Sequence, residues 1–341
     1  MSFIHTNRAY VIAEAGVNHN GSLDLARKLV LAAKEAGADA VKFQTFKAER
    51  VAQANAPKAD YQLRNTDRGE SQIEMLRKLE LPDSAHAELI ALCREVGIEF
   101  LSTPYNEEDI DFLQGLGVRA FKLASIHCVE PHILRYAART GRHLIVSTGM
   151  ATLAEVGAAV AAMRGVGHED FTLLQCTTNY PSAVADANLR VIPLLREEFG
   201  CAVGYSDHTQ SDVSSIAAVA LGATMIEKHF TLDNSMPGPD HTSAAEPAEF
   251  AALVEKIRAT ESALGSGVKK PCAAEMANAA NMRRSLVARR NIALGEVITE
   301  GHLTCQRPAT GISPLRVDEI TGRIADADIA AGTRIEFAMI V

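Results

Sequence analysis

The sequence predicts an α/β protein: a (β/α)8 TIM barrel over residues 1–264, a linker over 265–284 and a small β-rich domain over 285–341. Eight short apolar runs alternate with helix-like segments in the first part, as in the βα repeat of a barrel, and a doubly wound sheet usually has fewer strands. Beyond Leu264 the apolar runs shorten, and glycine and proline recur between them. That is typical of a turn-rich β domain. A core this small is marginal alone, so we expect the domain to pack on another part of the protein.

The predicted strands cover residues 10–14, 40–44, 100–103, 121–123, 144–147, 172–176, 203–206 and 225–229. A glycine ends the helix-like segment before each strand from the second onwards: Gly37, Gly97, Gly117, Gly141, Gly167, Gly200 and Gly222. Glycine suits the end of a helix because it adopts a left-handed backbone without steric cost.

Helix starts are marked in the sequence as well. Ser22 precedes a segment with apolar residues at helical spacing and predicts an N-cap. Thr152 and Glu155 have the spacing of a capping box, and Pro131 and Pro247 stand where a first helical residue is expected. These signals predict where the helices between the strands begin.

Composition excludes several classes of function. Lys and Arg number 34 against 42 Asp and Glu, and a net charge of −8 argues against nucleic-acid binding. No apolar run approaches the ~20 residues needed to span a bilayer, and the N-terminus lacks a secretory pattern. The six cysteines include no C-x-x-C pair, which argues against a zinc ribbon. We therefore expect a cytoplasmic protein with reduced thiols.

The predicted strands share one feature: each ends in polar or ionisable side chains. In chain order these are Glu14, Lys42, Gln44, Ser102, Thr103, Lys122, Ser125, Ser147, Thr148, Thr177, Thr178, Ser206, His208, Glu227 and His229. Catalytic groups of a barrel lie at the carboxyl ends of its strands. One or two inward polar groups are ordinary, whereas a full ring predicts an active site.

Two subsets of the ring suggest chemistry. Ammonium and hydroxyl donors suit a ligand with phosphate and carboxylate groups, although Lys42 and Lys122 could instead form structural ion pairs with Glu14 or Glu227. His208 and His229 end adjacent strands and could bind a metal ion or be hydrogen-bonded core residues. Their spacing does not choose among zinc, manganese and magnesium.

Ordered motifs resemble those of the bacterial sialic acid synthases over the whole length of the chain. They are 12–21 (IAEAGVNHNG), 40–44 (AVKFQ), 121–125 (FKLAS), 147–150 (STGM), 175–181 (QCTTNYP), 204–209 (GYSDHT), 226–231 (IEKHFT) and 238–240 (GPD). The C-terminal segment resembles the antifreeze-like SAF domain of these enzymes at Ala288, Gly295, Glu296, Leu303, Arg307, Pro308 and Gly311.

The resemblance implies a transferase that condenses phosphoenolpyruvate with an N-acylated hexose-type aldehyde, giving a nine-carbon 2-keto acid and phosphate. It implies that phosphoenolpyruvate is held by Lys42, Thr103, Lys122, Ser125, Ser147 and Ser206. It implies Mn2+ or Mg2+ on His208 and His229, and sugar contacts from Glu14, Gln44, Tyr180 and Asp240. In the family's domain-swapped homodimer an SAF arginine reaches the sugar from the partner subunit, and Arg307 occupies that position. Lys122 and the carboxyl groups of Glu14 and Glu227 are the expected catalytic groups, either carboxyl serving to move a proton or position water.

Two sugars are possible as the aldehyde substrate. The first is N-acetylmannosamine, giving N-acetylneuraminate. The alternative is a 2,4-diacetamido-2,4,6-trideoxyhexose, giving legionaminic or pseudaminic acid. Enzymes using N-acetylmannosamine have asparagine at the position of Thr178, and only Asn65 is a candidate for their sugar-loop asparagine. The Thr-Thr-x-Tyr-Pro pattern of this chain is similar to the pattern found at this position in legionaminic acid synthases.

Two rival classes make different predictions. A non-catalytic sugar-binding barrel should have lost Lys122, His208 or His229, and all three are present. A deoxy-sugar-phosphate synthase should carry additional basic groups for its sugar phosphate and has no reason to keep the C-terminal domain. The sequence therefore favours an active synthase.

Overall fold

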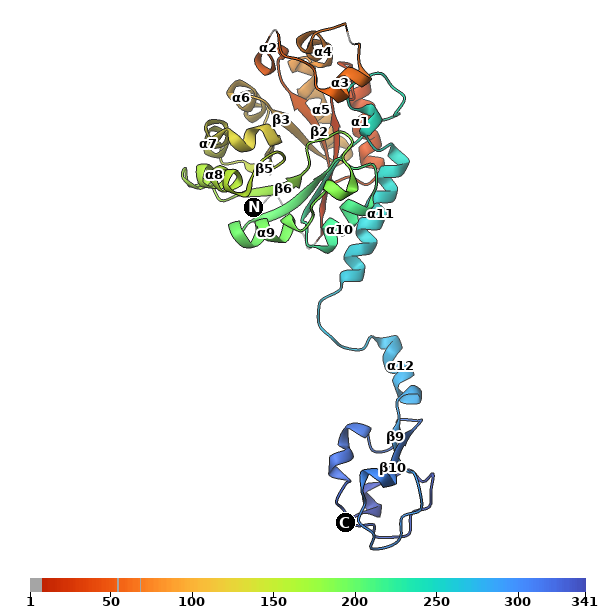
Figure 1. Cartoon of the computed structure of the whole chain (residues 1–341). Helices are drawn as coiled ribbons and strands as arrows, with labels where there is room; N and C mark the ends of the chain where they lie inside the picture. Colours follow the sequence, from red (N-terminus) through yellow and green to blue (C-terminus); the bar gives the residue numbers. More distant parts are fainter. Residues whose placement is uncertain (1–7, 54, 68) are drawn as a thin grey trace. The chain divides into compact units, whose positions relative to one another are not determined.

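A computed structural model describes residues 8–53, 55–67 and 69–341. The chain forms two units, Met1–Gly265 and Ser266–Val341 (Figure 1).

The first unit is built on a parallel eight-stranded sheet with the order β3-β2-β1-β8-β7-β6-β5-β4. Its strands are β1 Tyr10–Gly16, β2 Ala40–Thr45, β3 Glu99–Pro104, β4 Ala120–Leu123, β5 His143–Ser147, β6 Phe171–Cys176, β7 Ala202–Asp207 and β8 Met225–His229. The two strands that end this order, β3 and β4, also contact each other, so the sheet curls into a nearly closed barrel. The predicted barrel and its eight strands are confirmed.

Helices follow the strands and cover the outside of the barrel (Figure 1). They are α1 Leu23–Glu35, α5 Asp83–Val96, α6 Glu107–Gly115, α7 Pro131–Arg139, α8 Leu153–Arg164, α9 Val191–Phe199, α10 Val213–Ala220 and α11 Pro247–Leu264. The predicted starts are confirmed: the side chains of Ser22 and Thr152 cap α1 and α8, and α7 and α11 begin at a proline. Gly97 ends α5 in the left-handed conformation, with φ 72°.

Three short helices precede α5 between β2 and β3, where α5 alone would complete the repeat. They are α2 Ala48–Val51, α3 Asp60–Asn65 and α4 Gln72–Leu79. No pattern in the sequence predicted these three helices.

The interior of the barrel is layered because side chains of a strand alternate between its two faces. One buried layer is apolar and takes a residue from most strands: Ile12, Ala40, Leu101, Ala120, Ile145, Leu174 and Met225. Two residues further along these strands come Glu14, Lys42, Thr103, Lys122, Ser147, Cys176 and Glu227. The polar ring therefore lies directly above an apolar plug, at the carboxyl ends of the strands.

The second unit contains helix α12 (Ala273–Met282) and the antiparallel strands β9 (Ser285–Ala288) and β10 (Leu303–Gln306). Its own apolar core includes Leu286, Ile298, Ile320 and Ile335. Helix α12 lies inside the segment expected to be a linker. Within the described ranges, no helix has the length and apolar character needed to cross a membrane.

Candidate active site

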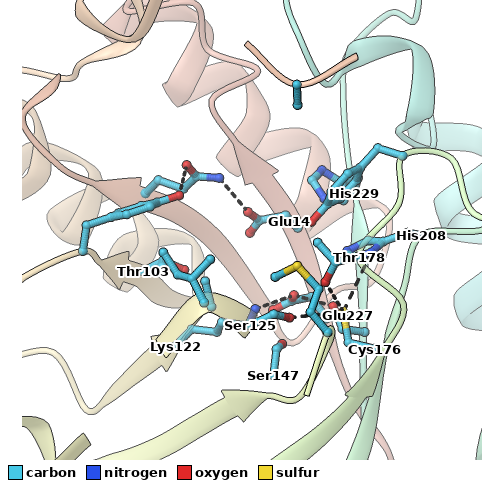
Figure 2. Close-up of a pocket in the computed structure, with 18 of the residues that line it drawn as sticks. Glu14, Thr103, Lys122, Ser125, Ser147, Cys176, Thr178, His208, Glu227 and His229 are labelled. Carbon is cyan, nitrogen blue, oxygen red and sulfur yellow. Dashed lines mark hydrogen bonds and ion pairs between the residues drawn. The ribbon is translucent and has the colours of Figure 1, made fainter. Parts of the chain in front are cut away.

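Two lysines and two glutamates form a buried ion-pair cluster at the base of the barrel mouth (Figure 2). Lys42 pairs with Glu14, and its Nζ lies 3.8 Å from Glu227 Oε2. Lys122 Nζ lies 3.2 Å from Glu227 Oε1. Lys42 also donates a hydrogen bond of 3.2 Å to Thr103 Oγ1. Both lysines are thus neutralised by the protein itself, and an anionic ligand has to compete with these glutamates.

The two glutamates of this cluster have pKa values displaced in opposite directions. Burial raises the pKa of Glu14 above its usual range, and the opposing charge of Lys42 does not cancel the effect. Burial also acts to raise the pKa of Glu227, but Lys122 and Lys42 outweigh it and lower the value to about 2. Pairs of carboxyl groups separated in this way are suited to different roles. Glu14 is the group able to carry a proton, and Glu227 stays ionised.

Serine hydroxyls surround the cluster. Ser206 Oγ donates a hydrogen bond of 2.9 Å to Glu227 Oε1, and Ser125 Oγ accepts one of 3.1 Å from the amide of Gly149. Ser147 Oγ is buried and has no hydrogen-bond partner among the described residues. A buried polar atom without a partner calls for an explanation, and a ligand oxygen would supply one.

His208 and His229 come together, with ring centroids 5.3 Å apart. Nδ1 of His208 lies 2.7 Å from the carbonyl oxygen of Thr177, and donation to this oxygen leaves Nε2 as a free acceptor. Nδ1 of His229 is buried and unpartnered among the described residues. Burial and the adjacent His208 lower the pKa of His229 well below its usual range, so its imidazole is neutral.

These observations fit a divalent cation. An imidazole held through Nδ1 by a backbone carbonyl is the usual arrangement of a metal-ligating histidine. In the part of the chain that the structure describes, no cluster of three or more metal-ligating side chains occurs. An ion here would take its remaining ligands from water and substrate. Burial acts to lower the pKa of His208, but Cys176 outweighs it and raises the value, so an ion would compete with a proton.

Aromatic side chains form one wall of the site. The ring of Tyr180 lies 4.3 Å from that of His208 and 5.5 Å from that of His229, and Tyr61 lies 5.1 Å from Tyr180. This series of rings runs from the histidine pair to helix α3.

A second series of contacts joins the ends of β2 and β3 to the ion-pair cluster. Gln44 Oε1 accepts a hydrogen bond of 3.0 Å from the hydroxyl of Tyr105, and Gln44 Nε2 lies 3.5 Å from Glu14 Oε1. Gln44 therefore links Tyr105 to the ion-pair cluster.

All these groups face one cavity of about 360 Å3. Of the predicted residues, it is lined by Glu14, Lys42, Gln44, Thr103, Lys122, Ser125, Ser147, Thr178, Tyr180, Ser206, His208, Glu227 and His229. Three members of the predicted ring, Ser102, Thr148 and Thr177, are not among the lining residues. The cavity is also lined by residues that no sequence pattern predicted: Val51, Tyr61, Gln62, Gln72, Leu76 and Tyr105. Tyr105 directly follows β3, so the strand-end rule could have included it. The others come from α2–α4 and their connections, whose only signal was the length of chain between two strands.

The expected sugar contacts Asp240 and Arg307 and the candidate Asn65 also lie elsewhere. Asp240 is buried in the loop after β8 but is not among the residues lining the cavity; burial and the charge of Glu14 raise its pKa to about 7. Asn65 donates through Nδ2 to Pro239 O (2.9 Å) and Thr242 Oγ1 (3.0 Å), which ties α3 to that loop. Arg307 is in the second unit, so its approach to a sugar remains a prediction.

Comparison with known proteins identifies the family. Residues 29–269 match the NeuB family, and residues 283–341 match the SAF domain. The chain belongs to the NeuB family. Its fold and domain composition are those of nonulosonic acid synthases, as the motifs predicted.

Three similar proteins each match more than three quarters of this NeuB family chain. N,N'-diacetyllegionaminic acid synthase of Campylobacter jejuni is 47% identical, over 93% of this chain and 96% of the relative. The Legionella pneumophila protein of the same name is 45% identical, over 96% and 93%. The solved N-acetylneuraminic acid synthetase of Leptospira borgpetersenii is 31% identical, with a TM-score of 0.71 over 81% of this chain and 92% of that one. These comparisons support a synthase, and favour the alternative reading of the sugar over N-acetylmannosamine.

Proposed function

We propose that this protein is an N,N'-diacetyllegionaminic acid synthase. It condenses phosphoenolpyruvate with a 2,4-diacetamido-2,4,6-trideoxyhexose and water, and it releases phosphate. The observation that carries the reaction is the buried Lys42–Glu14 and Lys122–Glu227 cluster beside the two histidines. The choice of sugar rests on the two legionaminic acid synthases, which are 47% and 45% identical to the chain.

Phosphoenolpyruvate fits the base of the cavity by charge. Its phosphate and carboxylate need charged or hydroxyl donors, which Lys42 and Lys122 supply together with Ser125, Ser147, Ser206 and Thr103. The anion takes the place of Glu14 at Lys42 and shares Lys122 with Glu227. A proton on Glu14, whose pKa is raised, reduces the repulsion between that carboxyl and the incoming anion.

The sugar fits the outer part of the cavity. Gln44 and the hydroxyls of Tyr61 and Tyr180 offer polar contacts, while Val51 and Leu76 offer apolar ones. A trideoxy sugar with two acetamido groups presents both kinds of surface, since it has a methyl group at C6 where N-acetylmannosamine has a hydroxymethyl group, and an acetamido group at C4 where N-acetylmannosamine has a hydroxyl. A divalent ion on His208 and His229, Mn2+ or Mg2+, would supply Lewis-acid polarisation of the aldehyde oxygen.

The reaction balances as follows. C3 of phosphoenolpyruvate forms a bond to the aldehyde carbon, and the aldehyde oxygen takes up a proton and becomes a hydroxyl. Water adds at C2 and gives up one proton, which restores the proton lost by the general acid. The C2–O bond to phosphate then breaks, the second proton of the water leaves with phosphate, and C2 becomes a ketone. We assign the proton that the aldehyde oxygen receives to Glu14, because its pKa is raised. Glu227 remains ionised and fixes Lys122 and Ser206.

Phosphate release from phosphoenolpyruvate with Mn2+ tests this function. We expect phosphate release with the 2,4-diacetamido-trideoxy sugar. We also expect a product whose mass equals that of the diacetylated nonulosonic acid. Release only with N-acetylmannosamine would contradict the sugar assignment. If folded and metal-loaded protein releases no phosphate with any of these sugars, a synthase function is contradicted altogether.

We also propose that Arg307 completes the sugar site from the partner subunit of a domain-swapped homodimer. Arg307→Ala should raise KM for the sugar and leave KM for phosphoenolpyruvate unchanged, because the other sugar and phosphate contacts belong to the barrel. Sedimentation should give the mass of two chains. A monomer, or normal sugar kinetics in the variant, would contradict this arrangement.

A further inference from the structure

The residues that precede the two histidines face each other across β7 and β8. Ser206 is in register with Glu227, and Asp207 with Lys228. Because side chains alternate along a strand, the first pair faces the cavity, the second faces outward, and the histidines that come next face the cavity again. Neither Asp207 nor Lys228 lines the cavity, and the proposed reaction uses neither of them.

The carboxylate of Asp207 is fully engaged. Oδ1 accepts from the amide and hydroxyl of Thr209, both at 2.8 Å, and lies 3.3 Å from the hydroxyl of Tyr205. Oδ2 accepts from Ser215 Oγ at 2.7 Å and from Lys228 Nζ at 3.1 Å. One buried side chain thus joins β7, the turn that leaves it, helix α10 and strand β8.

Lys228 secures the same turn from the neighbouring strand. Its Nζ donates to the carbonyl oxygens of Thr209 at 2.6 Å and Ser211 at 3.4 Å, in addition to Asp207. Three acceptors use all three donors of an ammonium group. The turn fixed in this way begins directly after His208, and Lys228 itself directly precedes His229.

Stability alone is a poor explanation for the pair. A buried ion pair often contributes no more stability than apolar residues of similar volume would. Here the pair also lies where any change in the spacing of β7 and β8 would move one imidazole relative to the other. On the inner side, Nδ1 of His208 is held by the carbonyl of Thr177, so the ring is fixed from both faces of the sheet.

We propose that Asp207 and Lys228 are positioning residues that hold His208 and His229 at the separation a divalent cation requires. The inference rests on the part of the proposed function that places an ion on these histidines, and it is independent of the sugar. Outer contacts of metal ligands commonly matter for affinity, and their loss typically costs about 10–100-fold in metal binding.

The chain provides a matched control. Lys58 is also buried, paired with Glu70 at 3.0 Å and hydrogen-bonded to Thr66 Oγ1 and Asp67 O, at 3.0 and 2.7 Å. It lies between β2 and β3 and is not among the residues that line the cavity. Lys58→Met therefore removes a buried ammonium group of the same kind without touching the histidine pair.

The test is titration of Mn2+ into the metal-free, full-length protein without substrates, with the melting temperature of each variant measured in parallel. His208→Ala should abolish binding. Lys228→Met should weaken the Mn2+ Kd by about 10–100-fold, whereas Lys58→Met should leave it unchanged. If Lys228→Met does not fold, Asp207→Asn, which keeps the side-chain shape, takes its place.

A double variant separates positioning from buried charge. Asp207→Asn with Lys228→Met leaves no unpaired charge, so its melting temperature should recover relative to Lys228→Met while Mn2+ binding stays weak. Mn2+ affinity that recovers together with the melting temperature would overturn the proposal. So would wild-type affinity in folded Lys228→Met, or wild-type protein that binds no Mn2+. Normal Mn2+ results with no turnover of any sugar would contradict the proposed function and leave this inference standing.

Discussion

The base and the outer wall of the cavity are built in different ways. The base consists of single side chains from successive strands, such as Lys42 and Lys122, fixed by ion pairs with Glu14 and Glu227. The outer wall comes from one long connection between β2 and β3, and its members, such as Tyr61, are aromatic, amide or apolar. The periodicity of the barrel dictates the base, whereas the wall depends on how one irregular segment packs. In the proposed function the base handles phosphoenolpyruvate and the wall selects the sugar.

The largest effect is expected from Lys122→Met at the base. It removes a donor to the phosphoenolpyruvate anion and leaves Glu227 without its closest lysine, and loss of one such preorganised group typically lowers turnover by about 10²–10³-fold. Steady-state phosphate release gives kcat/KM for each substrate. The exposed Lys34→Met is the control and should be unaffected. A variant impaired only in KM for the sugar would contradict the division between base and wall.

Asp240 and Glu227 should give opposite pH effects on stability. The pKa of Asp240 is raised to about 7, so the native state holds a proton that the unfolded state has lost. The carboxyl of Asp240 therefore contributes up to a few kcal/mol to the free energy of unfolding below pH ~4. This contribution is lost as the pH rises towards 7. The pKa of Glu227 is lowered to about 2, so its contribution is present above the unfolded value and lost as the pH falls towards 2.

Urea denaturation between pH 2 and 8 measures both effects. Asp240→Asn should flatten the decline in unfolding free energy between pH 4 and 7, and Glu227→Gln should flatten the rise between pH 2 and 4.5. If the unfolding free energy of both variants depends on pH as it does in the wild type, the pKa of Asp240 is not raised and that of Glu227 is not lowered in the folded protein.

A smaller effect is expected at Thr178, in the loop after β6. Its Oγ1 lies 3.9 Å from Cys176 Sγ, and its side chain lines the cavity. Thr178→Asn introduces the residue of the N-acetylmannosamine enzymes. It should raise kcat/KM for N-acetylmannosamine, relative to kcat/KM for the 2,4-diacetamido-trideoxy sugar, by about tenfold. A change of this size is within what a single side-chain contact can contribute to specificity. An unchanged ratio would mean that this loop does not select the sugar.

The smallest effect is expected in the outer wall, from Tyr61→Ala. Loss of its contact with Tyr180 should raise KM for the sugar by about 3–10-fold, the worth of one aromatic pair, without changing KM for phosphoenolpyruvate. Tyr136→Ala, on the outer helix α7, serves as the control. An equal rise in both KM values would show that Tyr61 supports the whole cavity.

These two regions also differ in how far the sequence could predict them. Strand ends follow a period of two, so Lys42, Lys122 and Glu227 were predicted to face one cavity from local pattern alone. Tyr61 was not, because a short helix in a long connection has no periodic signal that says which face meets the barrel. Asn65 was a candidate sugar contact, but its amide binds Pro239 and Thr242, a pairing of residues far apart in the sequence. Helix α12 was missed because none of its residues is buried.

The most direct test of the account follows the bridging oxygen of phosphoenolpyruvate. Phosphoenolpyruvate carries 18O as the oxygen between C2 and phosphorus, and it reacts with the 2,4-diacetamido-trideoxy sugar in the presence of Mn2+. The masses of both products are then measured by mass spectrometry. The account predicts that all label leaves with phosphate and that the C2 oxygen of the nonulosonic acid comes from water. Label retained in the sugar acid would mean that the P–O bond breaks, and would contradict addition of water at C2 in the mouth of this barrel.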